Sequence, residues 1–232
     1  MDALLSFTTL IILVPLTLFV VLKGKHLHKN EYKYYWGVGI LMCIATIVAI
    51  LAQLGIGLTR ETIEGIPFIY QTVFQGHMTF AFFILVMFAG AFKQKSKPKI
   101  MLMRVRRENA ILGFMFLVPH AAFLVVIALG ALNPTGTIAF LIMLPLFITS
   151  FPKIRKKMHP LQWRKLHKWA YPAYAMIYIH VASINTIAQE DSLRFVRLAI
   201  YTIIFAVYTY LKFKNYILAP KKKPAAQKKP SN

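Results

Sequence analysis

Apolar runs of about twenty residues dominate this sequence, and its polar residues are confined to the short stretches between them. An α-helix needs about 20 apolar residues to cross the hydrocarbon core of a bilayer, whereas the strands of a transmembrane barrel are apolar at every second position. With 58% hydrophobic and 15% charged residues, the chain also has too few charges to cover a soluble domain of its size. The sequence therefore predicts an all-α fold, a polytopic membrane helix bundle of about seven transmembrane helices. These helices are expected at about 3–22, 35–58, 72–92, 109–132, 137–150, 165–187 and 195–213.

The fifth of these helices is the shortest. Residues 133–136, Asn-Pro-Thr-Gly, are turn formers, so we expect the helix to begin at Thr137. The apolar stretch that ends at Ser150 would span only about 21 Å. We therefore expect this helix to continue towards Lys153 and to be kinked at Pro145.

The basic residues decide the expected orientation. The segments 23–33, 93–107, 151–168 and 212–232 hold 25 of the 28 Lys and Arg residues. The alternate connections hold only Arg60, Arg194 and Arg197. Because cytoplasmic connections carry the excess of Lys and Arg, the N-terminus is predicted to lie outside and the C-terminus in the cytoplasm. The net charge of +21 follows this membrane pattern and does not indicate a nucleic-acid partner.

Three parts of the chain are expected. Residues 1–34 form an N-terminal transmembrane helix and a basic cytoplasmic loop, residues 35–214 form the main helix bundle, and residues 215–232 form a basic tail. The first helix has no basic residue before it, so it is predicted to be a retained span and not a signal peptide. The tail is rich in Lys, Pro and Ala, and we expect it to be disordered and to touch anionic membrane lipid. The chain is predicted to be a multi-pass protein of the cell membrane.

Four of the seven histidines fall within the apolar runs, at His77, His120, His167 and His180. A histidine inside a bilayer is costly unless it is hydrogen-bonded, faces water or binds a metal. Each of them alone would be explained by a hydrogen bond to a neighbouring helix or by a water path. The other three histidines are expected to be solvated in connections: His26, His28 and His159.

The depth of these histidines separates them. His120 lies thirteen residues beyond Arg107, and His180 lies thirteen residues beyond His167, which is itself near the cytoplasmic face. On helices that run outward, this spacing places both at about 20 Å from the inner boundary. Two histidines at one level can bind one iron from opposite faces, which predicts a haem site. His77 also falls in the outer half, and the single Cys43 and the absence of a Cys-x-x-Cys-His motif mean that such a haem is not held by thioether bonds.

His167 and His180 stand in one predicted helix, but not on one face. Thirteen residues leave them roughly 140° apart on an ideal helix, and Pro172 between them is expected to kink it. Trp163 and Trp169 flank His167 and could stack on a flavin, although an interfacial aromatic belt explains them more simply.

These residues, taken with their spacing, resemble the ferric reductase-like transmembrane domain family, most closely its small branch of haem-binding membrane subunits of bacterial methionine sulfoxide reductase systems. Arg106-Arg107 followed by His120 resembles the paired arginines and helix histidine of the family. The segment 163–180 resembles its Trp-x-x-Leu-His-x-x-x-Tyr motif with a second histidine thirteen residues later, and Gly76-His77 resembles a weaker feature. The similarity covers about residues 72–213.

The resemblance implies b-type haem and electron transfer across the membrane. His120 and His180 would be the axial ligands of an outer haem. His167 and His77 would be ligands of a second haem or alternative ligands, but the family's partner for His167 stands where this sequence has Arg106. No nicotinamide or flavin domain follows the last span, so the implied donor is a quinol, a bound or free flavin (FMN or FAD), or a separate reductase. The implied acceptor is an extracytoplasmic protein or ferric iron.

Two other classes of function fit the composition. A transporter or channel could use the histidines to relay protons or to bind a cation, without haem. A membrane anchor for a soluble partner would not need His120 or His180. The chain is expected to be a haem-dependent membrane oxidoreductase subunit, because only that hypothesis explains the equal depth of these two histidines.

Overall fold

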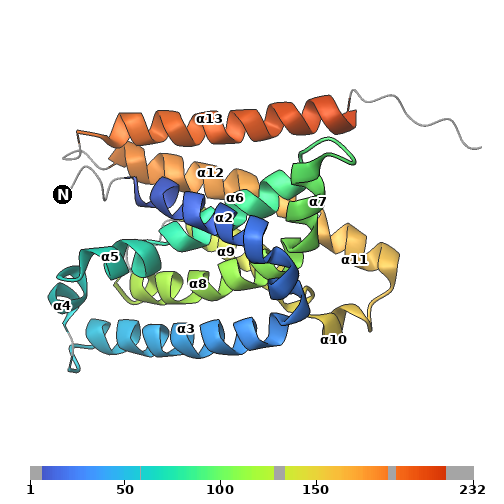
Figure 1. The fold of residues 1–232 in the computed structure, drawn as a ribbon. Helices are drawn as coiled ribbons and strands as arrows, with labels where there is room; N and C mark the ends of the chain where they lie inside the picture. Colours follow the sequence, from blue (N-terminus) through green and yellow to red (C-terminus); the bar gives the residue numbers. More distant parts are fainter. Residues whose placement is uncertain (1–6, 58, 128–133, 188–191, 218–232) are drawn as a thin grey trace, which may run out of the picture.

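The computed structural model describes residues 7–57, 59–127, 134–187 and 192–217, and it confirms the all-α fold. The regular elements among these residues are all helical. The long helices lie side by side in an elongated bundle (Figure 1). They are α2 (Thr8–Lys29), α3 (Glu31–Gln53), α6 (His77–Ala89), α8 (Arg106–Ile127), α9 (Pro134–Ile148), α12 (Ala170–Ile187) and α13 (Arg194–Lys212).

Short helices cover the two ends of the bundle. At one end lie α4 (Arg60–Glu64) and α5 (Pro67–Ile69), and at the other lie α7 (Lys97–Arg104), α10 (Pro152–Arg155) and α11 (Pro160–His167) (Figure 1). Two π-helical segments, η1 (Tyr70–Phe74) and η2 (Phe213–Ile217), adjoin α6 and α13. Single-turn π-helices are rare and often stand at functional sites, which makes η1 notable.

Helix α6 is the centre of the bundle. It is apolar on all sides, because other helices surround it and no side faces water. One side packs with α2 and α8, another with α9 and α12, and a third with α13. At Gly113 in α8, an added Cβ would lie 2.8 Å from the Cβ of Phe82, so α8 can approach α6 this closely only because residue 113 is glycine.

Several outer helices have the length and composition of membrane spans. Three described helices pass this test, namely α2, α3, and α13 with its extension to Tyr216, and the bent pair Pro67–Phe74 and His77–Ala89 would add a fourth. Large apolar side chains on these helices are exposed, for example Val14 (71%) and Trp36 (72%). Such an apolar surface would be unfavourable in water and indicates a membrane protein.

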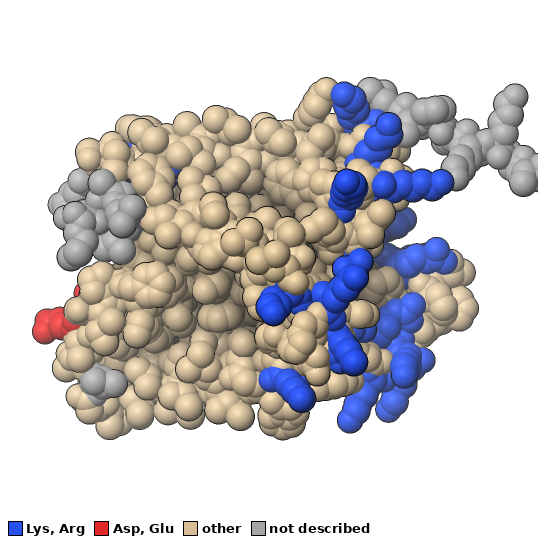
Figure 2. Space-filling model, viewed as in Figure 1, with Lys and Arg blue, Asp and Glu red and all other residues tan. Residues whose placement is uncertain are grey.

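The charged residues are segregated along the bundle. Lys and Arg gather at the end that carries α7, α10 and α11, whereas acidic side chains appear at the opposite end in this view (Figure 2). There Arg60 and Glu64 of α4 form an ion pair at 2.6 Å. The basic segments, which are separate in the sequence, therefore lie together at one end of the folded bundle.

Two expected boundaries are wrong. The basic segment at 23–33 is not a loop, because α2 continues to Lys29 and α3 starts at Glu31, with only Asn30 between them. Helix α9 begins at Pro134 and not at Thr137. Proline suits the first turn of a helix, where its missing N–H has no partner to lose, so the apparent turn formers at 134–136 start the helix.

The predicted helix at 165–187 is divided. Helix α11 ends at His167, residues 168–169 form a turn, and α12 begins at Ala170. Pro172 therefore falls in the first turn of α12, where it needs no kink. The two histidines that the sequence placed on one helix lie on two.

Candidate histidine site between helices α8 and α12

The structure brings His120 and His180 together. His120 comes from α8 and His180 from α12, and their ring centroids are 6.4 Å apart with the planes at 76°. These are two of the four histidines that the sequence assigned to the interior. Their ligand role stays a prediction, but their proximity is a feature of the fold.

The His120 ring packs against the segment that joins η1 to α6. Its Nδ1 lies 2.7 Å from the carbonyl oxygen of Phe74, the last residue of η1. A carbonyl only accepts, so Nδ1 carries the proton and Nε2 keeps its lone pair. Gly76 follows with φ +78°, and an added Cβ there would lie 3.1 Å from the His120 ring. In metal sites, the ligating histidine usually donates its other ring N–H to a carbonyl or carboxylate, which fixes the orientation of the ring. The Phe74 carbonyl holds His120 in the same way.

His180 packs against the first turn of α9. A Cβ added to Gly136 would lie 2.7 Å from Cε1 and 2.8 Å from Nδ1 of His180, so only glycine leaves room for the ring. The Nδ1 atom of His180 is buried and has no hydrogen-bond partner in the described part of the chain. Sequence reasoning missed Gly136 because it assigned this residue to a turn; Pro134 as a helix start was the available signal.

His77 begins α6 and is held on both ring nitrogens. Nδ1 lies 2.7 Å from Thr9 Oγ1, and Nε2 lies 3.0 Å from Gln71 Oε1. The hydroxyl of Tyr201 donates to Thr9 Oγ1 at 3.4 Å, which extends this buried polar chain to α13. His77 could therefore bind a metal only after losing one of these hydrogen bonds.

His167 lies apart from the pair, at the basic end. Its Nε2 is 3.1 Å from Thr149 Oγ1, and its ring stacks on Trp163 with centroids 4.0 Å apart. Burial and the positive charges of Arg106 and Arg155 lower the pKa of His167 to about 4. The ring is thus neutral at pH 7.

The three histidines expected in solvated connections all have partners. His26 Nδ1 lies 3.0 Å from the Tyr34 hydroxyl, and His159 Nδ1 accepts from the backbone N–H of Leu161 at 3.4 Å. His28 lies 2.8 Å from Glu108 Oε1, a carboxylate that is buried at the start of α8. The sequence offered no sign of this pairing, because the two residues are eighty positions apart.

Three observations are compatible with an iron bound by two imidazole ligands at this site. Imidazole nitrogens bind metals at about 2.0 Å, which would put two opposing ring centroids about 6.3 Å apart, close to the 6.4 Å found. The Nε2 lone pair of His120 is available, and His180 Nδ1, which lies beside Gly136, has no hydrogen-bond partner in the described part of the chain. Two glycines, Gly76 and Gly136, bring backbone close to the two rings.

Comparison with known proteins adds one relative. No family model and no solved structure matches the chain. The chain is similar to an uncharacterized protein of Treponema pallidum (strain Nichols), at 26% identity over 204 residues. The similarity covers 82% of this chain and 56% of that protein, so the chain spans about half the length of the relative it matches. The name of that protein states no activity.

Proposed function

We propose that the protein is a membrane electron carrier that binds haem b through His120 and His180. The observation that carries this proposal is the 6.4 Å separation of the two rings, from different helices, with Nδ1 of His120 fixed by a backbone carbonyl. In contrast to His77, whose two ring nitrogens are both hydrogen-bonded, His120 has a hydrogen bond on Nδ1 alone among the described residues. One haem is proposed, with His77 and His167 as candidates for a second.

Haem held by two imidazoles supplies a one-electron redox centre without an open position for oxygen. The protein's part is to hold both rings at a fixed distance, which limits rearrangement when the charge on the iron changes. The apolar side chains of the bundle around α6 keep water from the site and so influence its potential. The resemblance to ferric reductase-like domains supports the same assignment.

The direction of transfer follows from the proposed topology. Seven transmembrane helices with the basic end in the cytoplasm agree with the segregation of Lys and Arg, since these residues mark cytoplasmic connections. Electrons then pass outward through a multi-pass protein of the bacterial cytoplasmic membrane. The proposed donor is a quinol, a flavin or a separate reductase, and the proposed acceptor is an extracytoplasmic protein or ferric iron.

A proton or cation pathway without haem is the second candidate. The buried chain of Gln71, His77, Thr9 and Tyr201 favours it, because hydrogen-bonded groups in a membrane interior can relay protons. His77 in this chain directly follows Gly76, against which the His120 ring packs. The two candidates differ in one observable, since a transporter needs no haem.

The test is the haem content of the purified full-length protein, measured by pyridine haemochrome, for wild type and three alanine variants. We expect about one haem per chain, lost in His120→Ala and His180→Ala and kept in His167→Ala. Thermal unfolding of each variant separates loss of the ligand from loss of the fold. A colourless wild type after haem-replete expression would refute the proposal and favour the proton pathway.

A further inference from the structure

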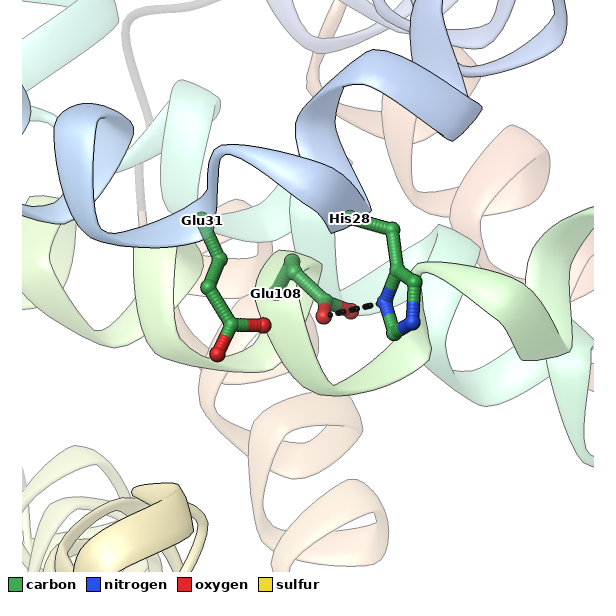
Figure 3. Close-up of side chains that lie close together, drawn as sticks. All are labelled: His28, Glu31 and Glu108. Carbon is green, nitrogen blue, oxygen red and sulfur yellow. Dashed lines mark hydrogen bonds and ion pairs between the residues drawn. The ribbon is translucent and has the colours of Figure 1, made fainter.

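A second cluster of metal-binding side chains lies at the basic end, away from the histidine pair. His28 stands in the last turn of α2, Glu31 is the first residue of α3, and Glu108 is in the first turn of α8. Their side chains point towards one another from three helices (Figure 3). One ligand atom from each residue lies within 4.8 Å of the others. Nothing in the proposed haem function uses these residues.

Glu108 is the central residue of this cluster. Its side chain is only 1% exposed, and it extends between the side chains of His28 and Glu31 (Figure 3). Oε1 is engaged by His28 and by Arg107, at 2.8 and 2.7 Å. Oε2 is buried and has no hydrogen-bond partner in the described chain. A buried carboxylate oxygen without a partner is costly and calls for an explanation such as a missing ion.

The charges of the cluster balance only if the His28 imidazole is protonated. Arg107 Nη2 contacts one oxygen of Glu31 and one of Glu108, so a single guanidinium serves two carboxylates. When His28 is neutral, as a metal-binding imidazole must be, the two carboxylates retain one negative charge that no described Lys or Arg side chain pairs with. Many Lys and Arg residues lie at the same end, yet Arg107 is the only described one within ion-pair distance of Glu108. A bound cation would supply the missing charge.

The donor set selects the kind of cation. One imidazole nitrogen and two carboxylate oxygens suit Zn²⁺ and neighbouring transition metals, whereas Mg²⁺ and Ca²⁺ prefer oxygen ligands alone. Ligand atoms around a tetrahedral metal lie about 3.4 Å apart at bonds of about 2.1 Å. The present spacing of up to 4.8 Å would have to shorten by about 1.4 Å, and the His28 side chain, which is 53% exposed, has room to rotate towards the two carboxylates. Arg107 leaves one oxygen of each carboxylate for the metal.

We propose that His28, Glu31 and Glu108 bind a divalent transition-metal cation of the Zn²⁺ class at the basic end of the bundle. The ion would tie the α2–α3 hairpin to the start of α8, and so fix the connection between the outer helices and the helix that carries His120. Its three protein ligands come from three helix ends, and they would leave a fourth position of a tetrahedral ion to water.

The test is Zn²⁺ binding to the full-length, chelator-treated protein, by competition with a chromophoric chelator. His28→Ala is the main variant, because the His28 side chain is 53% exposed and its removal leaves no core cavity. Glu108→Gln is the second, since it keeps the shape of the carboxylate. His26→Ala is the matched control: His26 lies in the same turn of α2 but contacts Tyr34.

We expect wild type and His26→Ala to bind one Zn²⁺, with affinity lowered by at least roughly tenfold in His28→Ala and Glu108→Gln. Zn²⁺ should also raise the unfolding temperature of wild type but not of His28→Ala. Equal binding by wild type and His28→Ala would overturn the proposal, as would the absence of binding in wild type. Haem content is not part of the readout, so the result is independent of the redox proposal.

Discussion

Gly136→Ala should displace His180 and weaken haem binding without unfolding the protein. The added Cβ would lie 2.7 Å from Cε1 of His180, whereas ordinary contacts begin at 3.4 Å. The ring must therefore move by about 0.7 Å, because Gly136 is fixed in α9. Metal–ligand distances tolerate deviations of only about 0.2 Å.

The size of the effect follows from the cost of overpacking. An extra methyl group in a packed site costs about 1–3 kcal/mol. If this cost falls on the haem-bound form, the affinity for haem falls by about 5- to 140-fold. The matched control is Gly37→Ala, since a Cβ at Gly37 has no neighbour within 4 Å. Alanine is the better helix former there by about 1 kcal/mol, so the control should bind haem as wild type does.

The assay is a titration of haemin into the haem-free protein, followed by the Soret band. Thermal unfolding of each variant in the same detergent shows whether the fold is intact. The reasoning would be refuted if Gly136→Ala were folded and bound haem as tightly as Gly37→Ala. That result would mean that the His180 ring can move away from residue 136 without weakening its bond to the iron.

Three further outcomes are expected. Gly76→Ala should lower haem affinity and stability more than Gly57→Ala; both glycines have positive φ, at 78° and 76°, but only the first has the His120 ring at 3.1 Å. Equal losses in the two variants would show that backbone strain alone is responsible. Gly113→Ala should destabilise the bundle by about 1–3 kcal/mol in thermal unfolding, because its Cβ would meet Phe82 on α6 at 2.8 Å, and an unchanged unfolding temperature would contradict this packing. The His167 pKa of about 4 is below its unfolded value, so the stabilisation that His167 provides is complete above about pH 6.5 and is lost as the pH falls towards 4. Between pH 7.5 and 5, wild type should therefore lose more thermal stability than His167→Asn, and parallel losses would argue against a neutral, buried His167.

Hydropathy alone predicted the helical class and the approximate place of each long helix. It succeeded for α6 because a centrally packed helix is apolar all round, so the run needs no knowledge of its neighbours. Counting residues from the basic ends predicted that His120 and His180 would lie at one depth, but for His180 the count assumed one helix over 165–187, which the structure divides at residues 168–169. It could not predict which way each ring points.

The positions of the His120 and His180 rings depend on contacts between segments that are distant in the sequence. The π-helical turn that presents the Phe74 carbonyl and the left-handed Gly76 have no periodic signature in the sequence. Gly136 was assigned to a turn because local composition outweighed the tendency of proline to start helices. The pairing of His28 with Glu108 joins helix ends eighty residues apart, which no local pattern reports.

The central claim, that His120 and His180 bind one iron, is tested most directly by the spin state of the ferric protein. Two strong imidazole ligands make ferric haem low-spin, which electron paramagnetic resonance detects. We expect a low-spin signal in wild type and its loss, with high-spin or absent haem, in His120→Ala and in His180→Ala. A low-spin signal that persists when both histidines are replaced, or a wild-type protein that binds no haem, would contradict the account.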